Sequence, residues 1–286
     1  MKNTDKFSVL MCVYALDDAK KFINAFNSIY FEQTIKPDEI IIVIDGSLPP
    51  ELSDTVENVI SSCPAVKIIK LNENLGRGEA RRIGMLACTM PLVAVMDADD
   101  LSVSERFELQ LECYRKDPSL SIVGGYIEEL SSEKGISHRL IRTVPLNDSD
   151  IRRGMKDRSP FNHITIMMRR DDVIAAGNYS GHFESEDYDL FFRMEQKGFR
   201  FLNLPMVLCV ISSDKNMYRR RGGWHYFKSE ASQHIEMYKC GFISFPRLIY
   251  NIALRFVVHS AAPNSFRIIL YRIFARKSKD KRNSSD

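Results

Sequence analysis

The sequence predicts an α/β fold: a mixed sheet with helices on both faces, followed by a basic, helical C-terminal extension. Three observations support this prediction. Short apolar runs alternate with helical patterns in the first half of the chain, the run IIIVI at residues 40–44 is typical of a parallel strand buried on both sides, and longer strand-like stretches begin at about Ile122. Ligands of such sheets bind beyond the carboxyl ends of the strands, so the residues that follow each strand are the first candidates for function.

The first half of the chain alternates strands and helices. Apolar or β-branched runs predict strands at residues 7–14, 40–44, 66–71 and 92–96. Between them, apolar residues three or four positions apart predict helices at residues 20–33, 51–62 and 78–88. Ser104 is expected to cap the next helix, which Asp117-Pro118 ends after about Lys116.

The second half has a mixed pattern. Strand-like stretches lie at residues 122–130, 139–144, 164–168 and 201–211, and one helix is strongly indicated near residues 186–196. These elements are expected to extend the same sheet. From Gly223 onward the pattern is mostly helical.

The composition excludes several classes of protein. The chain has 286 residues, 44% of them hydrophobic, and a net charge of +3, which fits neither a disordered polyelectrolyte nor a nucleic-acid-coating protein. Its longest uncharged stretch, residues 83–96, is shorter than the ~18–20 residues that cross a bilayer, and the N-terminus lacks a secretory signal. The six cysteines form no CxxC pair, so neither zinc nor a disulfide framework is expected. We therefore expect a folded cytoplasmic protein with no nucleic-acid partner.

The sharpest chemical signal is Asp97-Ala98-Asp99-Asp100, directly after the apolar strand 92–96. Three carboxylates in four residues repel one another unless a cation lies among them, and oxygen ligands of this kind suit Mg²⁺ or Mn²⁺. A divalent ion here would bridge a diphosphate. The alternative is a solvated acidic turn in which Asp100 caps the next helix.

A second carboxylate and a glycine-containing turn follow two other strands. Asp45 ends the strand 40–44, where it can accept a hydrogen bond from a nucleobase or ribose, or simply form an Asp-Gly turn. Residues 72–84 join a strand to a helix through Gly76 and Gly78, and backbone N–H groups there, with nearby arginines, can face an anion. The spacing is not G-x-G-x-x-G, which argues against a dinucleotide fold.

Four carboxylates cluster in the stretch Glu184–Asp189, at the start of the helix near residues 186–196. Acidic residues stabilise a helix N-terminus, but four of them exceed that need, so one is a candidate general base. His163 precedes a predicted strand and is either part of the same site or a structural residue. Arg219–Arg221, before Gly222-Gly223, is either a loop that closes over phosphates or a solvated run of charges.

Taken in order, these motifs resemble the family 2 glycosyltransferases of the GT-A fold, a Rossmann-like nucleotide-binding fold. The resemblance covers roughly residues 7–225. It is carried by SVLMCVY at 8–14, PDEIIIVIDGS at 37–47, NLGRGEARRIG at 74–84, LVAVMDADD at 92–100 and SEDYDLFFRM at 185–194. Within the family, the spacing looks like the transferases of amylovoran and O-antigen biosynthesis.

The resemblance assigns a role to each candidate residue. It makes Asp187 the catalytic base, Asp99 the metal ligand and Asp45 a contact to uracil. The other donor-binding residues would be Val13, Tyr14, Asn74, Gly76, Arg81, Asp97, Arg220 and Arg221, and the acceptor would contact Glu186, His163 and Trp224. Two positions depart from the family pattern, since Arg82 stands in place of asparagine and Phe191 in place of tryptophan.

The resemblance also implies an activity. It predicts a metal-dependent, inverting transfer of a hexose, from UDP-galactose or UDP-glucose, in β-linkage onto a sugar of a polyprenyl-diphosphate lipid in bacterial O-antigen or exopolysaccharide assembly. The alternatives are a catalytically degenerate partner subunit that only binds the nucleotide sugar, and a sugar-nucleotide pyrophosphorylase. The latter needs a glycine-rich loop after the first strand, where CVYALDD has no glycine.

The C-terminal part of the chain is basic. Residues 247–286 hold nine Lys and Arg against two Asp and Glu, so the rest of the chain is slightly acidic. We expect a catalytic domain at residues 1–225 and a helical extension at 226–286. Helices that alternate apolar and basic residues either lie on an anionic membrane surface or pack on the catalytic domain. The first case predicts a peripheral protein on the inner face of the cytoplasmic membrane.

Overall fold

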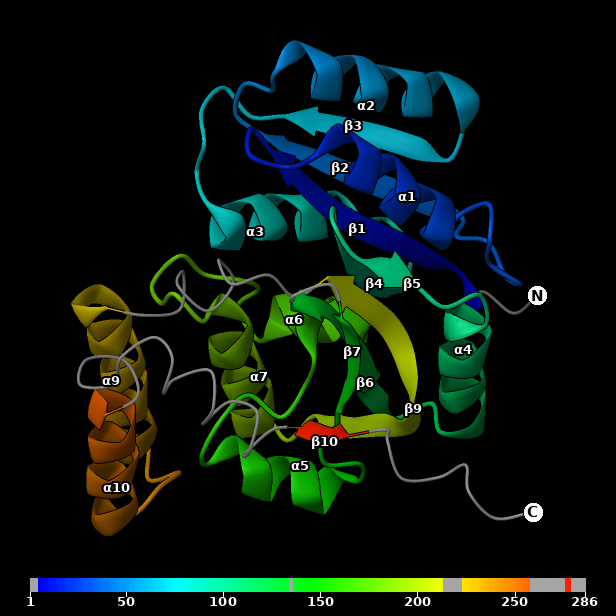
Figure 1. Cartoon of the computed structure of the whole chain (residues 1–286). Helices are drawn as coiled ribbons and strands as arrows, with labels where there is room; N and C mark the ends of the chain where they lie inside the picture. Colours follow the sequence, from blue (N-terminus) through cyan, green and yellow to red (C-terminus); the bar gives the residue numbers. More distant parts are fainter. Residues whose placement is uncertain (1–4, 134–135, 213–222, 258–275, 279–286) are drawn as a thin grey trace.

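The computed structural model describes residues 5–133, 136–212, 223–257 and 276–278 (Figure 1). Within these ranges, ten strands belong to a single sheet. Helices lie on both faces of the sheet (Figure 1). The predicted α/β architecture with a mixed sheet is confirmed.

Four parallel strands form the N-terminal half of the sheet. In spatial order they are β3 (Val66–Lys70), β2 (Glu39–Asp45), β1 (Phe7–Tyr14) and β4 (Leu92–Asp97). The helices between them are α1 (Ala19–Ile29), α2 (Pro50–Ser62) and α3 (Arg77–Ala87). Because side chains alternate along a strand, Ile40 and Ile42 join the core beneath α1 and α2, whereas Ile41 and Val43 join the core beneath α3. β2 is therefore buried on both sides, as its run of β-branched residues predicts.

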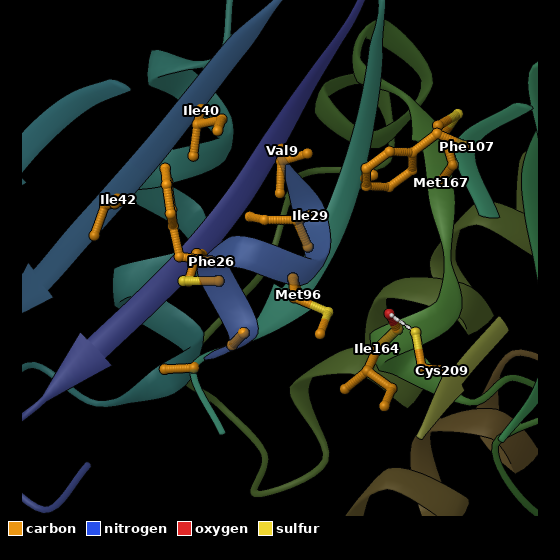
Figure 2. Close-up of a cluster of buried hydrophobic side chains, with 14 of the residues drawn as sticks. Val9, Phe26, Ile29, Ile40, Ile42, Met96, Phe107, Ile164, Met167 and Cys209 are labelled. Atoms are coloured by element: carbon orange, nitrogen blue, oxygen red, sulfur yellow. Dashed lines mark hydrogen bonds between the residues drawn. The ribbon is translucent and has the colours of Figure 1, made fainter. Parts of the chain in front are cut away.

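The core beneath α1 fixes the strands that end at the site. Figure 2 shows Phe26 and Ile29 of α1 over Val9, Ile40 and Ile42 of the sheet, and all five side chains are buried. Burial of each such side chain contributes roughly 1.5–3 kcal/mol. This packing holds β1, β2 and β4 in register up to their carboxyl ends.

The second half of the sheet is mixed. It contains β5 (Leu101–Ser102), β6 (Leu120–Glu133), β7 (Ile136–Arg142), β8 (Met167–Arg169) and β9 (Arg200–Ser212). The short strand β8 is antiparallel to both β4 and β6, so it joins the two halves. The helices of this half are α4 (Arg106–Lys116), α5 (Asp148–Met155), α6 (Arg170–Ala175) and α7 (Glu186–Gln196).

Three details of the predicted elements are wrong. The first helix ends at Ile29 because the buried amide of Gln33 donates to Ser28 O (2.6 Å) and Val103 O (2.7 Å), which draws the chain toward the rim of the sheet. The expected strand 164–168 begins with a 3₁₀ turn, in which the Thr165 hydroxyl donates to Asn162 O (2.7 Å). Ser104 is not the cap of α4, since its hydroxyl donates to the neighbouring Glu105 carboxylate (2.6 Å).

The C-terminal part of the chain contains two packed helices, α9 (Trp224–Lys239) and α10 (Phe245–Phe256), which lie beside each other at one edge of the molecule (Figure 1). It is not wholly helical, because β10 (Arg276–Ser278) pairs antiparallel with β7. No helix in the described ranges is long and apolar enough to cross a membrane.

Candidate active site

The predicted site residues meet where the parallel strands end. In the register of the sheet, Tyr14 of β1 lies opposite Asp45 of β2, and Cys12 of β1 lies opposite Asp97 of β4. Residues 98–100 continue from the end of β4 as a turn, so that Asp97, Asp99 and Asp100 lie together at this end of the strand. The carboxyl ends of β2, β1 and β4 therefore bring Asp45, Tyr14 and the acidic turn to one edge of the sheet.

Asp45 anchors the loop before α3. Its two carboxylate oxygens accept hydrogen bonds from the backbone N–H groups of Leu75 (2.7 Å) and Gly76 (3.0 Å), and the Asn74 amide donates to Asp45 O (3.3 Å). Gly76 has φ +84°, a backbone conformation that L side chains rarely adopt. Asp45, Asn74 and Gly76 thus form one unit, whose carboxylate retains lone pairs for a further donor.

Arg81 of α3 links the acidic turn to α7. Its guanidinium donates to Asp97 (2.7 Å) and to Glu186, and both Arg81 and Glu186 are buried. Burial opposes the charge on Arg81, but the carboxylates of Asp97 and Glu186 outweigh it and raise its pKa above the ordinary value. Burial raises the pKa of Glu186, and Arg81 opposes this rise. The ion pairs join three elements that are distant in sequence.

The acidic turn carries three carboxylates in different surroundings. Desolvation disfavours the charge on Asp97, but Arg81 and then His163 and Arg77 hold its pKa below the usual value. Asp99 is exposed. Asp100 is buried, and burial followed by repulsion from Asp97 and Asp99 raises its pKa to about 9. The turn therefore concentrates more negative charge than its own surroundings stabilise.

This turn fits a divalent cation bound together with a substrate. The described residues contain no preformed group of three or more His, Cys, Asp or Glu side chains for a metal ion. Mg²⁺-type sites commonly use only one or two carboxylates, with water and substrate phosphates completing the shell. Crowded carboxylates that include an exposed one, Asp99, are consistent with that kind of site.

Asp187 lies in the first turn of α7 and is partly buried. Its charge contributes to the pKa values of His163 and Tyr179, so these three groups share one environment. Asp189 differs, because its carboxylate accepts from the Ser180 hydroxyl (2.9 Å) and forms an ion pair with Arg193 (2.9 Å). Of these two acids, Asp189 has a structural role and Asp187 remains the candidate base.

His163 is neutral in the folded protein. Burial and then the charge of Arg81 lower its pKa to about 3. Its Nε2 lies 2.9 Å from the Tyr179 hydroxyl, and its Nδ1 has no hydrogen-bond partner among the described residues. A neutral ring of this kind can take part in hydrogen bonds but does not carry charge.

A protein-family model matches the part of the chain that contains these motifs. The model of glycosyl transferase family 2 matches residues 8–177, which contain the strand ends, Asp45, Arg81 and the acidic turn. The chain belongs to glycosyl transferase family 2.

Two curated relatives of this family 2 glycosyltransferase align over most of their length. The amylovoran biosynthesis glycosyltransferase AmsE of Erwinia amylovora is 33% identical over 83% of this chain and 88% of the relative. The UDP-Gal:α-D-GlcNAc-diphosphoundecaprenol β-1,3-galactosyltransferase of Escherichia coli is 32% identical over 96% of this chain and 98% of the relative. These matches confirm membership of the family, and they support glycosyltransferase activity over a pyrophosphorylase.

Solved structures confirm the GT-A fold of the glycosyltransferase. A mannosyltransferase from Pyrobaculum calidifontis, solved with GDP-Man and Mn²⁺, superposes with a TM-score of 0.61 at 15% identity, over 92% of this chain and 72% of the other. TarS of S. aureus gives the same TM-score over 88% of this chain and 43% of the other. The α/β class and the GT-A prediction agree with both.

One arginine of the glycosyltransferase, Arg77, is not among the predicted site residues. Of the three arginines near the start of α3, Arg81 binds Asp97 and Glu186, and Arg82 is paired with Glu79 (2.5 Å). Arg77 is exposed, makes no ion pair with the described residues, and adds positive potential at Asp97 and His163. Its place at the first position of α3 would have identified it as the arginine best placed for an anion.

Four of the predicted donor and acceptor residues make no side-chain hydrogen bond to Asp45, Arg81 or the acidic turn within the described ranges, or lie outside those ranges. Trp224 is the first residue of α9 and is exposed, with its ring stacked on Phe227. Val13 is buried in β1. Arg220 and Arg221 lie outside the described residues.

The buried His234 and the part-buried His163 predict an acid-dependent stability of the glycosyltransferase. Burial and then Arg255 lower the pKa of His234 to about 4, and His163 behaves likewise. Both folded-state values lie below the value of ~6.5 expected in the unfolded chain, so this stabilisation is complete above about pH 6.5 and is lost as the pH falls. Each histidine is expected to lower the free energy of unfolding by up to about 1.4 kcal/mol per pH unit, measured by urea denaturation between about pH 7 and pH 5.

The matched variants are His163→Gln and His234→Gln, with the exposed His182→Gln as the control. Each buried-site variant should flatten the pH dependence, whereas the control should not. An unchanged slope in both buried-site variants would contradict the assignment.

Proposed function

We propose that this chain transfers a hexose, from UDP-galactose or UDP-glucose, onto a sugar carried by a polyprenyl diphosphate, with inversion and in β-linkage. The observation that carries the proposal is the meeting of Asp45, the acidic turn, Arg81 and Asp187 at one edge of the sheet. The name of the Escherichia coli relative, which specifies UDP-Gal and GlcNAc-diphosphoundecaprenol, supports the choice of donor and acceptor. The product would enter O-antigen or exopolysaccharide assembly.

The donor would lie across the strand ends. Val13 and Tyr14 end β1 beside Asp45, whose carboxylate is the acceptor for a uracil N–H. Asn74 and Gly76 form the loop that Asp45 holds, and Asp97 would face the ribose or sugar. Arg77 is the arginine best placed for the diphosphate, with Arg220 and Arg221 as further candidates.

Asp99 would hold Mn²⁺ or Mg²⁺ against the donor diphosphate. Such an ion, when bound, offsets the negative charge that grows on the leaving nucleoside diphosphate. The exposed Asp99 carboxylate beside Asp97 supports a cation at this turn, because a positive charge there offsets the negative charge of these acids. The remaining coordination would come from phosphate oxygens and water.

Asp187 would remove the proton from the acceptor hydroxyl. As the hydroxyl oxygen attacks the anomeric carbon, its proton moves to an Asp187 carboxylate oxygen, and the bond from that carbon to the diphosphate breaks on the opposite face. A single displacement of this kind inverts the anomeric configuration. His163 and Trp224 are candidates for orienting the acceptor. Glu186 accepts a hydrogen bond from Arg81, so it would influence the acceptor only indirectly.

The two parts of the chain would have separate roles, catalysis and location at the membrane. Residues 1–225 would form the catalytic domain, and residues 226–286 an extension that brings it to the inner face of the cytoplasmic membrane. The basic composition of residues 247–286 and a lipid-linked acceptor support this location.

In the deciding experiment, the purified protein is incubated with Mn²⁺, a synthetic N-acetylglucosaminyl-diphosphate lipid and, one at a time, each UDP-sugar of a panel. Mass spectrometry should show addition of one hexose from UDP-galactose or UDP-glucose. Absence of any hexosyl product and of UDP release, across the panel, would favour the degenerate partner subunit instead.

Replacing Asp99 is expected to remove metal-dependent donor binding without unfolding the protein. Asp99→Ala should lower transfer by about a hundredfold or more, because the leaving diphosphate loses its counter-charge. Titration calorimetry should show that UDP binding no longer strengthens when Mn²⁺ is added. The control is Asp54→Asn, an exposed acid on α2. Mn²⁺-dependent UDP binding that survives in Asp99→Ala would refute the assignment.

A further inference from the structure

Helix α10 exposes a continuous apolar side. Its outward side carries no charged residue and consists of Phe245, Pro246, Ile249, Tyr250, Ala253, Leu254, Phe256 and Val257, the last being the residue after the helix. Exposure is high for large apolar side chains, with Phe245 at 57%, Ile249 at 52% and Tyr250 at 58%. An exposed apolar surface of this kind marks an interaction site. We call these eight residues the α10 face.

The inward side of α10 holds its buried polar groups together with the apolar Leu248 and Ile252, which pack in the core. Asn251 donates to Lys156 O (2.8 Å), and Arg255 donates to Asp157 O (2.6 Å) and forms an ion pair with Glu230 (3.1 Å). Arg247 donates to the Asp157 carboxylate (2.8 Å). These contacts fix which side of the helix faces the catalytic domain, so the apolar side faces outward because specific bonds hold it there.

We propose that the α10 face docks onto the surface of an anionic lipid bilayer. This rests on the proposed function in one respect, namely that the acceptor is carried by a membrane lipid. Tyr250, Phe245 and Phe256 supply the aromatic rings that favour the bilayer interface, and Trp224 and Tyr238 of α9 are exposed in the same helix pair.

Charge identifies the occupant of this face as lipid. Residues 258–286, which directly follow it, contain seven Lys and Arg against two Asp and Glu. Anionic headgroups attract such a segment, with each cation near the surface adding to the binding. A second copy docked through the same face would bring two of these segments together and so oppose dimerisation.

The docking helices also contact the motif that carries the candidate base. The Ser185 hydroxyl donates to Gln233 of α9 (2.8 Å, buried), and the Glu184 N–H donates to the Ser229 hydroxyl of α9 (2.8 Å). Residues 184 and 185 immediately precede Glu186 and Asp187. A bilayer bound at α10 is therefore held in a fixed relation to Asp187, as transfer to a lipid-borne acceptor requires.

The test is flotation of the full chain with vesicles. Unaltered protein should float with vesicles of phosphatidylcholine and phosphatidylglycerol, and much less with phosphatidylcholine alone. Ile249→Glu/Leu254→Glu should lower the bound fraction by about tenfold or more, because two charges enter the apolar face. The matched control is Phe31→Glu/Leu86→Glu, which places the same charges at two exposed apolar positions outside the extension.

A water-soluble, short-chain acceptor keeps the two proposals distinguishable. The α10 variant should transfer to it at the unaltered rate but need a higher concentration of acceptor embedded in vesicles. Unchanged flotation of the α10 variant would overturn the docking proposal, as would a shift from dimer to monomer in light scattering, which would assign the face to a second copy. Absence of transfer to the soluble acceptor, with flotation behaving as expected, would refute the proposed function alone.

Discussion

Asp187→Asn is expected to lower the turnover number by about a thousandfold while leaving UDP-sugar binding nearly unchanged. General-base catalysis contributes about 10²–10⁴ in rate, and asparagine keeps the shape of the side chain but cannot take up the hydroxyl proton. Asp187 is partly buried in the first turn of α7, next to the buried Glu186. The substitution removes one charge without opening a cavity, so the fold should persist.

The measurement is single-turnover transfer to a saturating acceptor, together with calorimetric titration of UDP. Glu184→Gln is the matched control, since it neutralises an exposed acid three residues earlier. The control should stay within about twofold of the unaltered enzyme. If Asp187→Asn retained turnover within about tenfold, the base would have to be sought in another group near His163.

The pH profile adds a second test of the same residue. His163 has a pKa of about 3 and so does not titrate near neutral pH. If Asp187 is the base, the acid limb of kcat/KM reports a carboxylate, and His163→Gln leaves that limb in place. A limb that disappears with His163→Gln would transfer the role of base to the histidine.

The parallel half of the fold was predictable because its signals are local. The run at residues 40–44 contains only β-branched residues, and such a run predicts a strand buried on both sides; the structure places its side chains in two cores. The same locality explains why Asp45 and Asp97 were found, since each directly follows an apolar strand. Residues at strand ends of a parallel sheet converge whatever lies between them.

The unpredicted parts depend on contacts that the local pattern does not contain. Helix α5 buries only Ile151 and Met155, too few for a periodic signal, although its N-cap Asn147 accepts from the Asp150 N–H (3.0 Å) and was a usable sign. The turn at residues 163–165 forms because Thr165 bonds to Gly125, 40 residues away. The apolar face of α10 looks in sequence like a packed helix, and only the contacts of Asn251 and Arg255 show which side faces outward.

Arg81 illustrates the same limit at the site itself. The family resemblance makes it a donor contact, but its partners Asp97 and Glu186 are 16 and 105 residues away in sequence. With both carboxylates bound, the guanidinium positions the acidic turn against α7. It acts on the donor through Asp97 and on Asp187 through Glu186, the residue beside it.

Arg81→Met is therefore expected to destabilise the protein and to impair catalysis together. Removing one partner of a buried ion pair leaves the others uncompensated, which costs about 3–5 kcal/mol. Arg81 and Glu186 are nearly inaccessible, at 6% and 5% exposure, so water cannot replace the lost partner. Urea denaturation should show this loss, whereas Arg82→Met, which breaks a half-exposed pair with Glu79, should cost no more than about 1 kcal/mol.

A second pair of variants separates positioning from folding. Arg81→Met/Glu186→Leu removes both buried charges and should recover part of the lost stability, because a well-packed apolar pair replaces an ion pair at little cost. The turnover of this double variant should stay low. Asp97 has lost its ion pair with Arg81, and Asp187 no longer has a neighbour at position 186 that Arg81 holds in place. Recovery of turnover along with stability would mean that Arg81 acts only on folding. A stable but inactive double variant would establish Arg81 as a positioning residue for both the donor-binding turn and the candidate base.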